Sequence, residues 1–259
     1  MKKIFAASVA LLMIFFTGCG DESKGDRVLV IGVDNFAPMG FHDAQGNFVG
    51  FDVDMAKEAA KRMGVEPEFK IIDWNEKEHE INSGRVDMIW NGLNITGNRD
   101  QYMLFSRPYM DNRQILMVKH GNPRGIHALG DLENKIVATQ AGSNSETYIN
   151  EDDALRETFA AFETYRTISE GFDGLNSGKF DALIIDEIAA RYEIIQKPGA
   201  FEIVEVTIGS STKFGIGFPK DKTELRDEVQ KVFSDMIKDG TAKKISLKWF
   251  GADLIKSGR

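Results

Sequence analysis

The sequence predicts an α/β protein of two similar lobes that face one cleft. The prediction depends on a pattern that occurs twice, as Asn-Ser-Gly-Arg-Val-Asp-Met-Ile at 82–89 and Asn-Ser-Gly-Lys-Phe-Asp-Ala-Leu at 176–183. Each copy follows a helical pattern, breaks at a glycine and enters a short apolar run that ends in polar residues. Two α/β units of this design place polar groups beyond strands on both sides of a cleft, which can close over a small polar ligand.

The first half of the chain alternates strands and helices. Residues 27–33 are rich in Val, Leu and Ile and predict a buried parallel strand. Asp52 is expected to cap a helix that stops at Gly64; together with Asp54 it would also suit a metal, but capping is the simpler explanation. The other expected elements are strands at 48–49, 68–72 and 86–90 and a helix at 75–83. This order implies a parallel sheet covered on both faces.

The second half repeats the rhythm. We expect strands at 135–139, 180–185 and 201–206, a helix capped by Ser143 or Asn144, a helix at 186–196, an apolar run at 214–218 and a helix at 222–238. The chain then crosses between the lobes twice, at 111–113 and at 208–213. Residues 27–110 with 214–259 would form lobe 1, residues 114–207 would form lobe 2, and the two crossings would form a hinge.

The N-terminus carries an export signal. Lys2 and Lys3 precede thirteen apolar or small residues at 4–16, a run too short to cross a membrane as a helix. We therefore expect residues 1–18 to be a signal peptide. Its end, Thr17-Gly18-Cys19, resembles the bacterial lipoprotein signal, although Phe16 replaces the usual aliphatic residue. Cys19 would carry the lipid and 19–26 would be a tether; the alternative is an ordinary signal peptide cleaved elsewhere.

Composition narrows the class of protein. The 259 residues suit two domains, and 32 basic against 40 acidic residues argue against a nucleic-acid partner. Cys19 is the only cysteine, so no internal disulfide forms. The histidines are scattered and show no metal-ligand spacing, so we expect no metal site. We also expect no cofactor and a monomer.

The candidate site lies where the predicted strands end, because ligands of open α/β sheets bind beyond the carboxyl ends of strands. Four segments occupy such positions: 34–38, 91–99, 140–145 and Asp186. In the loop at 91–99, Gly92 lets the backbone approach a ligand between Asn91 and Asn94. Arg99 offers a planar fork that matches a carboxylate, although a solvated arginine is the alternative.

The other segments allow two explanations each. The turn at 140–145 opens a helix at Ser143 and Asn144, and free N–H groups at a helix start attract anions. Asp186 could hold an ammonium group or cap the helix that follows. Phe36 and Trp74 could form an aromatic slot or pack in the core. Asp34 could meet a cationic or amide side chain or cap a turn.

Three runs resemble the polar amino acid binding proteins of ABC importers: Gly50-Phe51-Asp52-Val53-Asp54-Met55-Ala56, Asn94-Ile95-Thr96-Gly97-Asn98-Arg99 and Phe105-Ser106-Arg107-Pro108-Tyr109. The resemblance extends from about residue 28 to 250. It implies the two-lobe periplasmic binding protein type II fold, with a hinge.

The resemblance also implies roles for the candidate residues. Arg99 would pair with the α-carboxylate of an amino acid, assisted by backbone N–H groups of Asn94 and Asn144, and Asp186 would receive the α-ammonium. Phe36 and Trp74 would flank the ligand side chain, and Asp34 would contact its polar end. Asn91, Asn94 and the 143–145 segment depart from the family's usual serines and threonines, so the lining differs from the common pattern.

The sequence thus predicts an extracytoplasmic, lipid-anchored protein that captures a polar L-amino acid and delivers it to an ABC permease. Asp34 favours a basic amino acid, with glutamine next. One alternative is an enzyme on the same fold, like those that dehydrate cyclic carboxylic acids, with Glu187 as the only proton donor to nominate. Another is a sensor protein that presents its ligand to a receptor.

Overall fold

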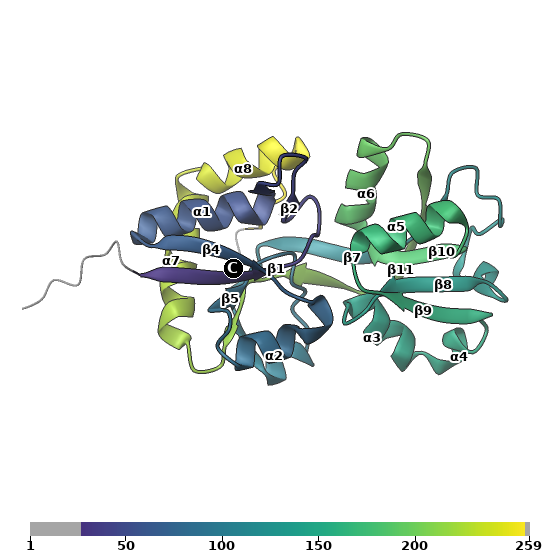
Figure 1. The fold of residues 1–259 in the computed structure, drawn as a ribbon, viewed down its shortest axis with the longest axis horizontal. Coiled ribbons are helices and arrows are strands. Elements are labelled where there is room, and N and C mark those ends of the chain that lie inside the picture. Colours follow the sequence, from purple (N-terminus) through teal and green to yellow (C-terminus); the bar gives the residue numbers. More distant parts are fainter. Residues whose placement is uncertain (1–26, 257–259) are drawn as a thin grey trace, which may run out of the picture.

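The computed structural model describes residues 27–256, which form two α/β lobes side by side (Figure 1). The expected signal peptide at 1–18 and the Cys19 tether lie outside the described residues, as do residues 257–259. Each lobe is built on a five-stranded sheet. The predicted α/β class and the division into two lobes are therefore confirmed.

The first sheet has the strand order β4-β1-β5-β12-β6. Strand β1 pairs in parallel with β4 and β5, whereas β12 is antiparallel to β5 and β6. The bounds are β1 Val28–Val33, β4 Glu66–Ile71, β5 Met88–Ile89, β6 Met103–Phe105 and β12 Gly217–Pro219; a separate hairpin contains β2 Phe41–His42 and β3 Phe48–Val49.

Helices cover both faces of this sheet (Figure 1). One apolar cluster joins β1 to α1, α7 and α8, and another packs the opposite face against α2. The bounds are α1 Phe51–Met63, α2 Lys77–Asn82, α7 Thr223–Lys238 and α8 Thr241–Phe250, with the 3-10 turns η1 Trp74–Glu76 and η2 Arg99–Gln101. Helix α8 was not predicted from the sequence.

The second sheet has the order β11-β7-β10-β8-β9 and the same layering. Helices α5 and α6 pack on one face, and α3 packs on the other. The bounds are β7 Met110–Lys119, β8 Ile136–Gln140, β9 Ala161–Tyr165, β10 Ala182–Asp186, β11 Phe201–Phe214, α3 Asn144–Glu151, α4 Asp153–Arg156, α5 Ile168–Ser177, α6 Glu187–Gln196 and η3 Leu129–Leu132.

The repeated sequence pattern folds into the same local structure twice. Asp87, just before β5, accepts from the backbone N of Val30 at 2.8 Å, and Asp181, just before β10, accepts from that of Ile136 at 2.9 Å. The backbone N of each aspartate also donates to the backbone carbonyl of the same partner residue, at 2.8 Å in both lobes. The two copies thus fasten each β-strand to its neighbour in the same way.

Two expectations about element bounds were wrong. Helix α1 begins at Phe51 after an N-cap at Gly50, so Asp52 lies inside the first turn and is not the cap. The strand expected at 201–206 continues to Phe214, because β11 pairs along the whole of β7 despite two bulges. The two predicted crossings therefore lie next to each other as one antiparallel ladder, with Asn112 opposite Thr212.

Candidate functional site

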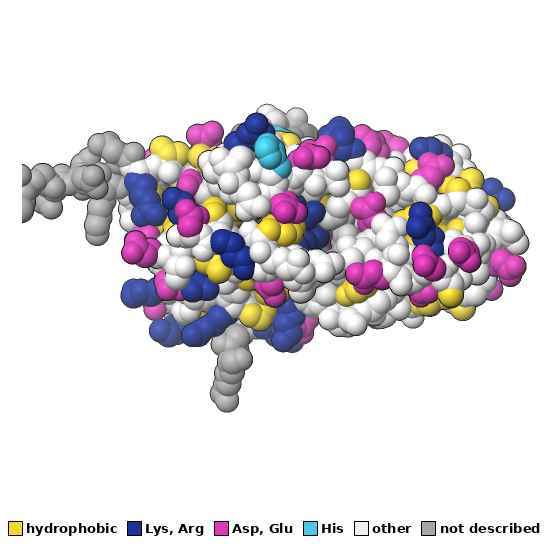
Figure 2. Space-filling model, turned by 90° about the horizontal axis from the view of Figure 1, so that it is seen from below, with side chains coloured by type: hydrophobic (Ala, Val, Ile, Leu, Met, Phe, Trp, Pro, Cys, Tyr) yellow, Lys and Arg dark blue, Asp and Glu magenta, His cyan; other side chains and the backbone are white. Residues whose placement is uncertain are grey.

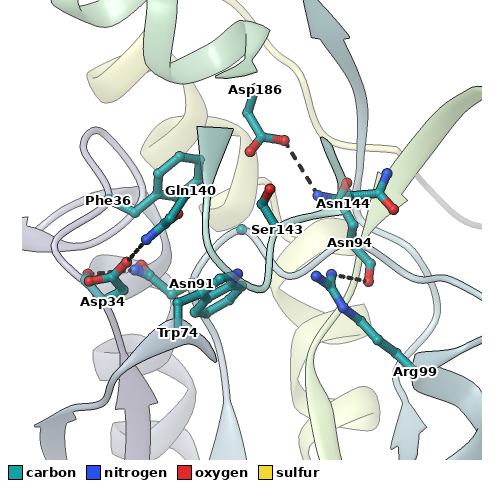
Figure 3. A pocket seen from close by; sticks show the side chains of 11 residues that line it. Asp34, Phe36, Trp74, Asn91, Asn94, Arg99, Gln140, Ser143, Asn144 and Asp186 are labelled. Carbon is teal, nitrogen blue, oxygen red and sulfur yellow. Dashed lines mark hydrogen bonds between the residues drawn. The ribbon is translucent and has the colours of Figure 1, made fainter. Parts of the chain in front are cut away.

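A cavity lies between the lobes, beyond the carboxyl ends of β1, β5, β8 and β10. All ten residues that the sequence analysis selected for the site line this cavity, together with one that it did not select, Gln140 (Figure 3). The ten are Asp34, Phe36, Trp74, Asn91, Gly92, Asn94, Arg99, Ser143, Asn144 and Asp186.

The loop after β5 is held from behind by Asp52. The Oδ2 atom of this buried carboxylate accepts from the backbone N of Gly92 at 2.7 Å and from the hydroxyl of Tyr109 at 2.8 Å. Gly92 has a φ of 61°, and a Cβ atom there would lie 2.5 Å from the Phe36 ring, so only glycine fits. Burial raises the pKa of Asp52 to about 7.

Arg99 is buried in lobe 1 and points into the cavity. It is 5% exposed, so the alternative of a solvated arginine is wrong. Its Nη1 donates to the carbonyl of Asn94 at 2.9 Å, and its Nη2 donates to the carbonyl of Gly142, on the other lobe, at 3.2 Å. Burial lowers the pKa of Arg99, but a guanidinium remains protonated in proteins. The site therefore presents a fixed cation.

Asp186 belongs to lobe 2 and lines the same cavity as Arg99 (Figure 3). It stands at the N-cap position of α6, but its carboxylate makes no capping hydrogen bond. Instead Oδ1 accepts from Gln114 at 2.7 Å, from Asn94 at 3.4 Å and from Asn112. Within residues 27–256, Oδ2 accepts no hydrogen bond, so one carboxylate oxygen is left for a ligand. Burial raises the pKa of Asp186, and the three amide donors oppose that rise.

Asp34 lies on the other side of the cavity, with Phe36 and Trp74 nearby (Figure 3). Its Oδ2 accepts from the Gln140 amide, on the opposite lobe, at 2.6 Å, and its Oδ1 accepts from the backbone N of Asn35 at 2.7 Å. Burial raises the pKa of Asp34.

Asn91 adds an unsatisfied acceptor beside Asp34. Its Nδ2 donates to the carbonyls of Asp34 and Gly40, which fixes the orientation of the amide. Its buried Oδ1 has no hydrogen-bond partner in the part of the chain that the structure describes. A buried acceptor without a donor is costly, so this atom suits a donor on a ligand.

The start of α3 supplies donors to the cavity. Ser143 caps this helix by accepting from the backbone N of Glu146 at 3.1 Å, as one of the two expected caps. The Nδ2 atom of Asn144 is buried and has no acceptor among the described residues. Both side chains lie at the helix N-terminus, where the backbone favours negative charge.

Sequence reasoning missed three amides of the site. Gln140 stands at the end of β8, inside a segment already selected, and its position at a strand end was the available signal. Asn112 and Gln114 lie on β7, on either side of Arg113, so strand alternation turns both of them toward Asp186. The sequence shows that these two amides lie on the same face of a strand. Only the pairing of β7 with β10 shows that the carboxylate they reach is that of Asp186.

The lobes touch across the cavity through polar contacts. In addition to the Asp34–Gln140 and Arg99–Gly142 bonds, Lys77 of lobe 1 donates to the carbonyl of Gly142 at 2.7 Å. Asn94 of lobe 1 reaches Asp186 of lobe 2. The structure is therefore a closed arrangement of the two lobes.

The described residues, those of the cavity included, contain no cluster of histidine, cysteine or acidic side chains able to hold a metal. None of their helices is long and apolar enough to span a membrane. In the view of Figure 2, acidic and basic side chains are interspersed over both lobes, and hydrophobic side chains form only small patches. That face shows no continuous basic surface of the kind that binds nucleic acid.

Comparison with known proteins agrees with this fold. Residues 29–252 match the bacterial extracellular solute-binding proteins, family 3. The L-cystine-binding protein TcyJ of Escherichia coli strain K12 is 29% identical, with 99% of this chain and 95% of that protein aligned. The lysine/arginine/ornithine-binding periplasmic protein of the same strain is 30% identical, over 96% of this chain and 97% of that protein.

A solved structure is also similar: a substrate-binding protein of an ABC uptake transporter from Streptococcus pneumoniae with bound histidine. Its TM-score is 0.84 at 32% identity, over 89% of this chain and 95% of that one. Two α/β lobes around a polar cavity define an extracytoplasmic solute-binding protein with the type II fold. The chain belongs to the bacterial extracellular solute-binding proteins, family 3.

Proposed function

We propose that this protein captures a free polar L-amino acid between its lobes and delivers it to an ABC permease. The observation that carries the proposal is the pair of opposite charges on opposite lobes, Arg99 and Asp186, at one cavity. A zwitterion that contacts both groups interacts more strongly with the closed form than with the open form. Such differential contact is what a ligand needs to shift the equilibrium toward closure.

The carboxylate of the ligand would lie beside Arg99. The guanidinium is buried and donates to two carbonyls, and a charge-assisted bond to a carboxylate is roughly twice as strong as a neutral one. The unpaired Nδ2 of Asn144, at the start of α3, supplies a further donor on this side. The α-ammonium would lie at Oδ2 of Asp186, since the three amides occupy Oδ1.

The ligand's side chain would extend toward Asp34, between Phe36 and Trp74. This end of the cavity offers acceptors: the Asp34 carboxylate and the unpaired Oδ1 of Asn91. A basic side chain, or the amide of glutamine, can donate to both. An acidic ligand would bury two carboxylates together, which is costly. We therefore propose a basic amino acid or glutamine; the relatives named for histidine and for lysine, arginine and ornithine support the first choice.

We propose capture by hinge closure without catalysis. Residues 111–113 and 208–213 form the hinge in this proposal, and their antiparallel pairing lets both crossings bend together. Glu187, the nominated proton donor of an enzyme, is held by Arg113 at 2.6 Å and by Arg191 at 2.7 Å. These contacts lower its pKa to about 2, so it is a poor proton donor near neutral pH.

We further propose that lipid on Cys19 anchors the mature protein outside the cytoplasmic membrane. The motif Thr17-Gly18-Cys19 supports this assignment. Replacing Cys19 by serine should release the protein from the membrane fraction into the soluble extracytoplasmic fraction. Membrane retention of the serine variant would contradict the anchor and leave the binding proposal untouched.

The binding proposal is tested by a melting-temperature screen against the twenty amino acids and cystine, followed by calorimetry. A ligand at a hundred times its Kd adds about 2.7 kcal/mol to the free energy of unfolding, which gives a clear shift. Arginine, lysine, histidine or glutamine should give the largest shift. A larger shift with glutamate, aspartate or cystine would refute the proposed ligand class. If no compound of the whole panel shifts the melting temperature, amino acid binding itself is refuted.

A further inference from the structure

Lys77, the first residue of α2, is a buried lysine that the proposed ligand contacts do not use. Its side chain is 5% exposed and does not line the cavity. Its Nζ donates to the carbonyl of Trp74 at 3.0 Å within lobe 1, and to the carbonyl of Gly142 at 2.7 Å on lobe 2. It also lies 5.6 Å from the centre of the Trp74 ring. One of its two acceptors thus belongs to the other lobe.

The loop at Gly142 is shaped to cover this amine. Gly142 has a φ of 70°, and a Cβ atom there would lie 2.8 Å from Cα of Asn75 and 3.0 Å from Nζ of Lys77. The loop therefore packs directly on the start of α2, with no room for a side chain. Because the loop belongs to lobe 2, moving the lobes apart removes this cover and exposes Lys77 to water.

The covered position suits an uncharged amine better than an ammonium. Two carbonyls accept from Nζ, which matches the two N–H groups of a neutral amine and leaves the third N–H of an ammonium without an acceptor. Within residues 27–256, no carboxylate lies within 4.0 Å of Nζ to form an ion pair. Arg99 brings a permanent positive charge to the same Gly142 carbonyl.

We propose that Lys77 couples ligand capture to the release of a proton: closure encloses its amine beneath the Gly142 loop, and the ammonium gives one proton to the solvent as it enters. The inference rests on the proposed function, because the ligand drives the closure. Lys77 acts as a positioning residue here, since it holds the loop that follows β8 without touching the ligand.

The charges around Lys77 set the direction of the pH dependence. Burial lowers its pKa from 10.5 to about 7, and Arg99 contributes in the same direction. Glu146 on α3, Glu78 on α2 and Asp73 before η1 oppose this shift. Between these two values the open form holds a proton that the closed form has lost. Ligand affinity therefore rises with pH from about 7 upward, and below that pH Lys77 contributes no pH dependence because it is protonated in both forms.

Calorimetry at pH 8.5, in two buffers of different ionisation enthalpy, counts the protons released as the preferred amino acid binds. The wild-type protein should release about one proton more per ligand than Lys77→Met. From pH 7.5 to 8.5 the ratio of wild-type to Lys77→Met affinity should increase by up to about tenfold. The ionisation of the ligand itself is common to both proteins and cancels in the comparison.

Lys57→Met is the matched control. Lys57 also donates to a carbonyl (that of Phe48, at 3.0 Å) and lies 5.7 Å from the centre of an aromatic ring (that of Phe69), but it is exposed on lobe 1. The Lys57→Met protein should release as many protons on ligand binding as the wild type. A second variant, Gly142→Ala, should weaken binding at least tenfold by obstructing closure. Its circular dichroism spectrum should match that of the wild type, which shows that the protein is still folded.

The outcomes separate the two proposals. Equal proton release and parallel pH profiles for wild type and Lys77→Met, with binding intact, would overturn the role of Lys77 and leave amino acid capture standing. Unchanged binding by Gly142→Ala would overturn the enclosure of Lys77 as well. A wild-type protein that binds no amino acid refutes the proposed function and this inference together.

Discussion

The side-chain amide of Gln140 donates to the carboxylate of Asp34 across the cavity, with 2.6 Å between Nε2 and Oδ2. The two residues are 106 positions apart and belong to different lobes. When the lobes close, a buried acid of lobe 1 thus receives a donor from lobe 2. In the proposed pose the side chain of the ligand shares Asp34 with Gln140, so we expect recognition at this end of the cavity to depend on both residues.

Replacing Gln140 by leucine should weaken binding of every ligand, because Asp34 loses a donor in the closed form. A hydrogen bond to a charged group contributes about 1.5–3 kcal/mol, so roughly tenfold or more should be lost. The loss should be smaller for arginine than for glutamine, since a cationic side chain compensates for the missing amide. Calorimetry with both ligands measures this difference. Gln45→Leu, on the exposed β2–β3 turn, is the control and should bind normally.

Replacing Arg99 by alanine should abolish most binding. The ligand carboxylate would be buried without its partner, a loss of about 2–5 kcal/mol, which corresponds to at least roughly thirtyfold in Kd. Arg85→Ala removes an exposed arginine of the same lobe that pairs with Glu80, and its affinity should be unchanged. Equal affinities for Arg99→Ala and wild type would exclude the proposed pose.

Replacing Asp186 by asparagine tests the ammonium contact. The amide keeps the size of the side chain but removes its charge. Wild-type protein should prefer an amino acid strongly over the same compound without its α-amino group, and Asp186→Asn should lose most of that preference. Competition calorimetry with the two compounds gives the ratio directly. If the ratio does not change, the ammonium lies elsewhere.

Asp52 should make stability depend on pH. Its pKa is about 7 in the folded protein and near 3.8 when exposed, so the folded state binds the proton more tightly. The stabilisation is complete below about pH 4 and is lost as the pH rises toward 7, by up to about 1.4 kcal/mol per pH unit. Chemical denaturation of wild type and Asp52→Asn between pH 4.5 and 8 should show this difference in slope. Parallel curves would mean that Asp52 ionises normally.

The sequence alone was informative where the governing interactions are local. Apolar periodicity and the two Asn-Ser-Gly breaks identified the two α/β units, and the polar residues after the strands, two aromatic residues and the family resemblance identified the ten cavity residues. Bounds were less accurate for β11, because its length is set by pairing with β7. Helix α8 was missed altogether; it packs on α1 and α7 by side chains that its own pattern did not reveal.

What the sequence by itself determined was which residues stand at strand ends and in which lobe, since chain direction and alternation fix both. Only the tertiary structure decided the hydrogen-bond partners of each buried ionisable group. Asp52 was expected to cap its own helix and instead holds Gly92 and Tyr109; Asp186 leaves its helix uncapped and accepts from three amides. Lys77 donates to the carbonyl of Gly142, 65 residues away in the sequence. The physical reason is that a buried ionisable group forms hydrogen bonds with the groups that packing places next to it, and the local sequence pattern does not encode neighbours that are distant along the chain.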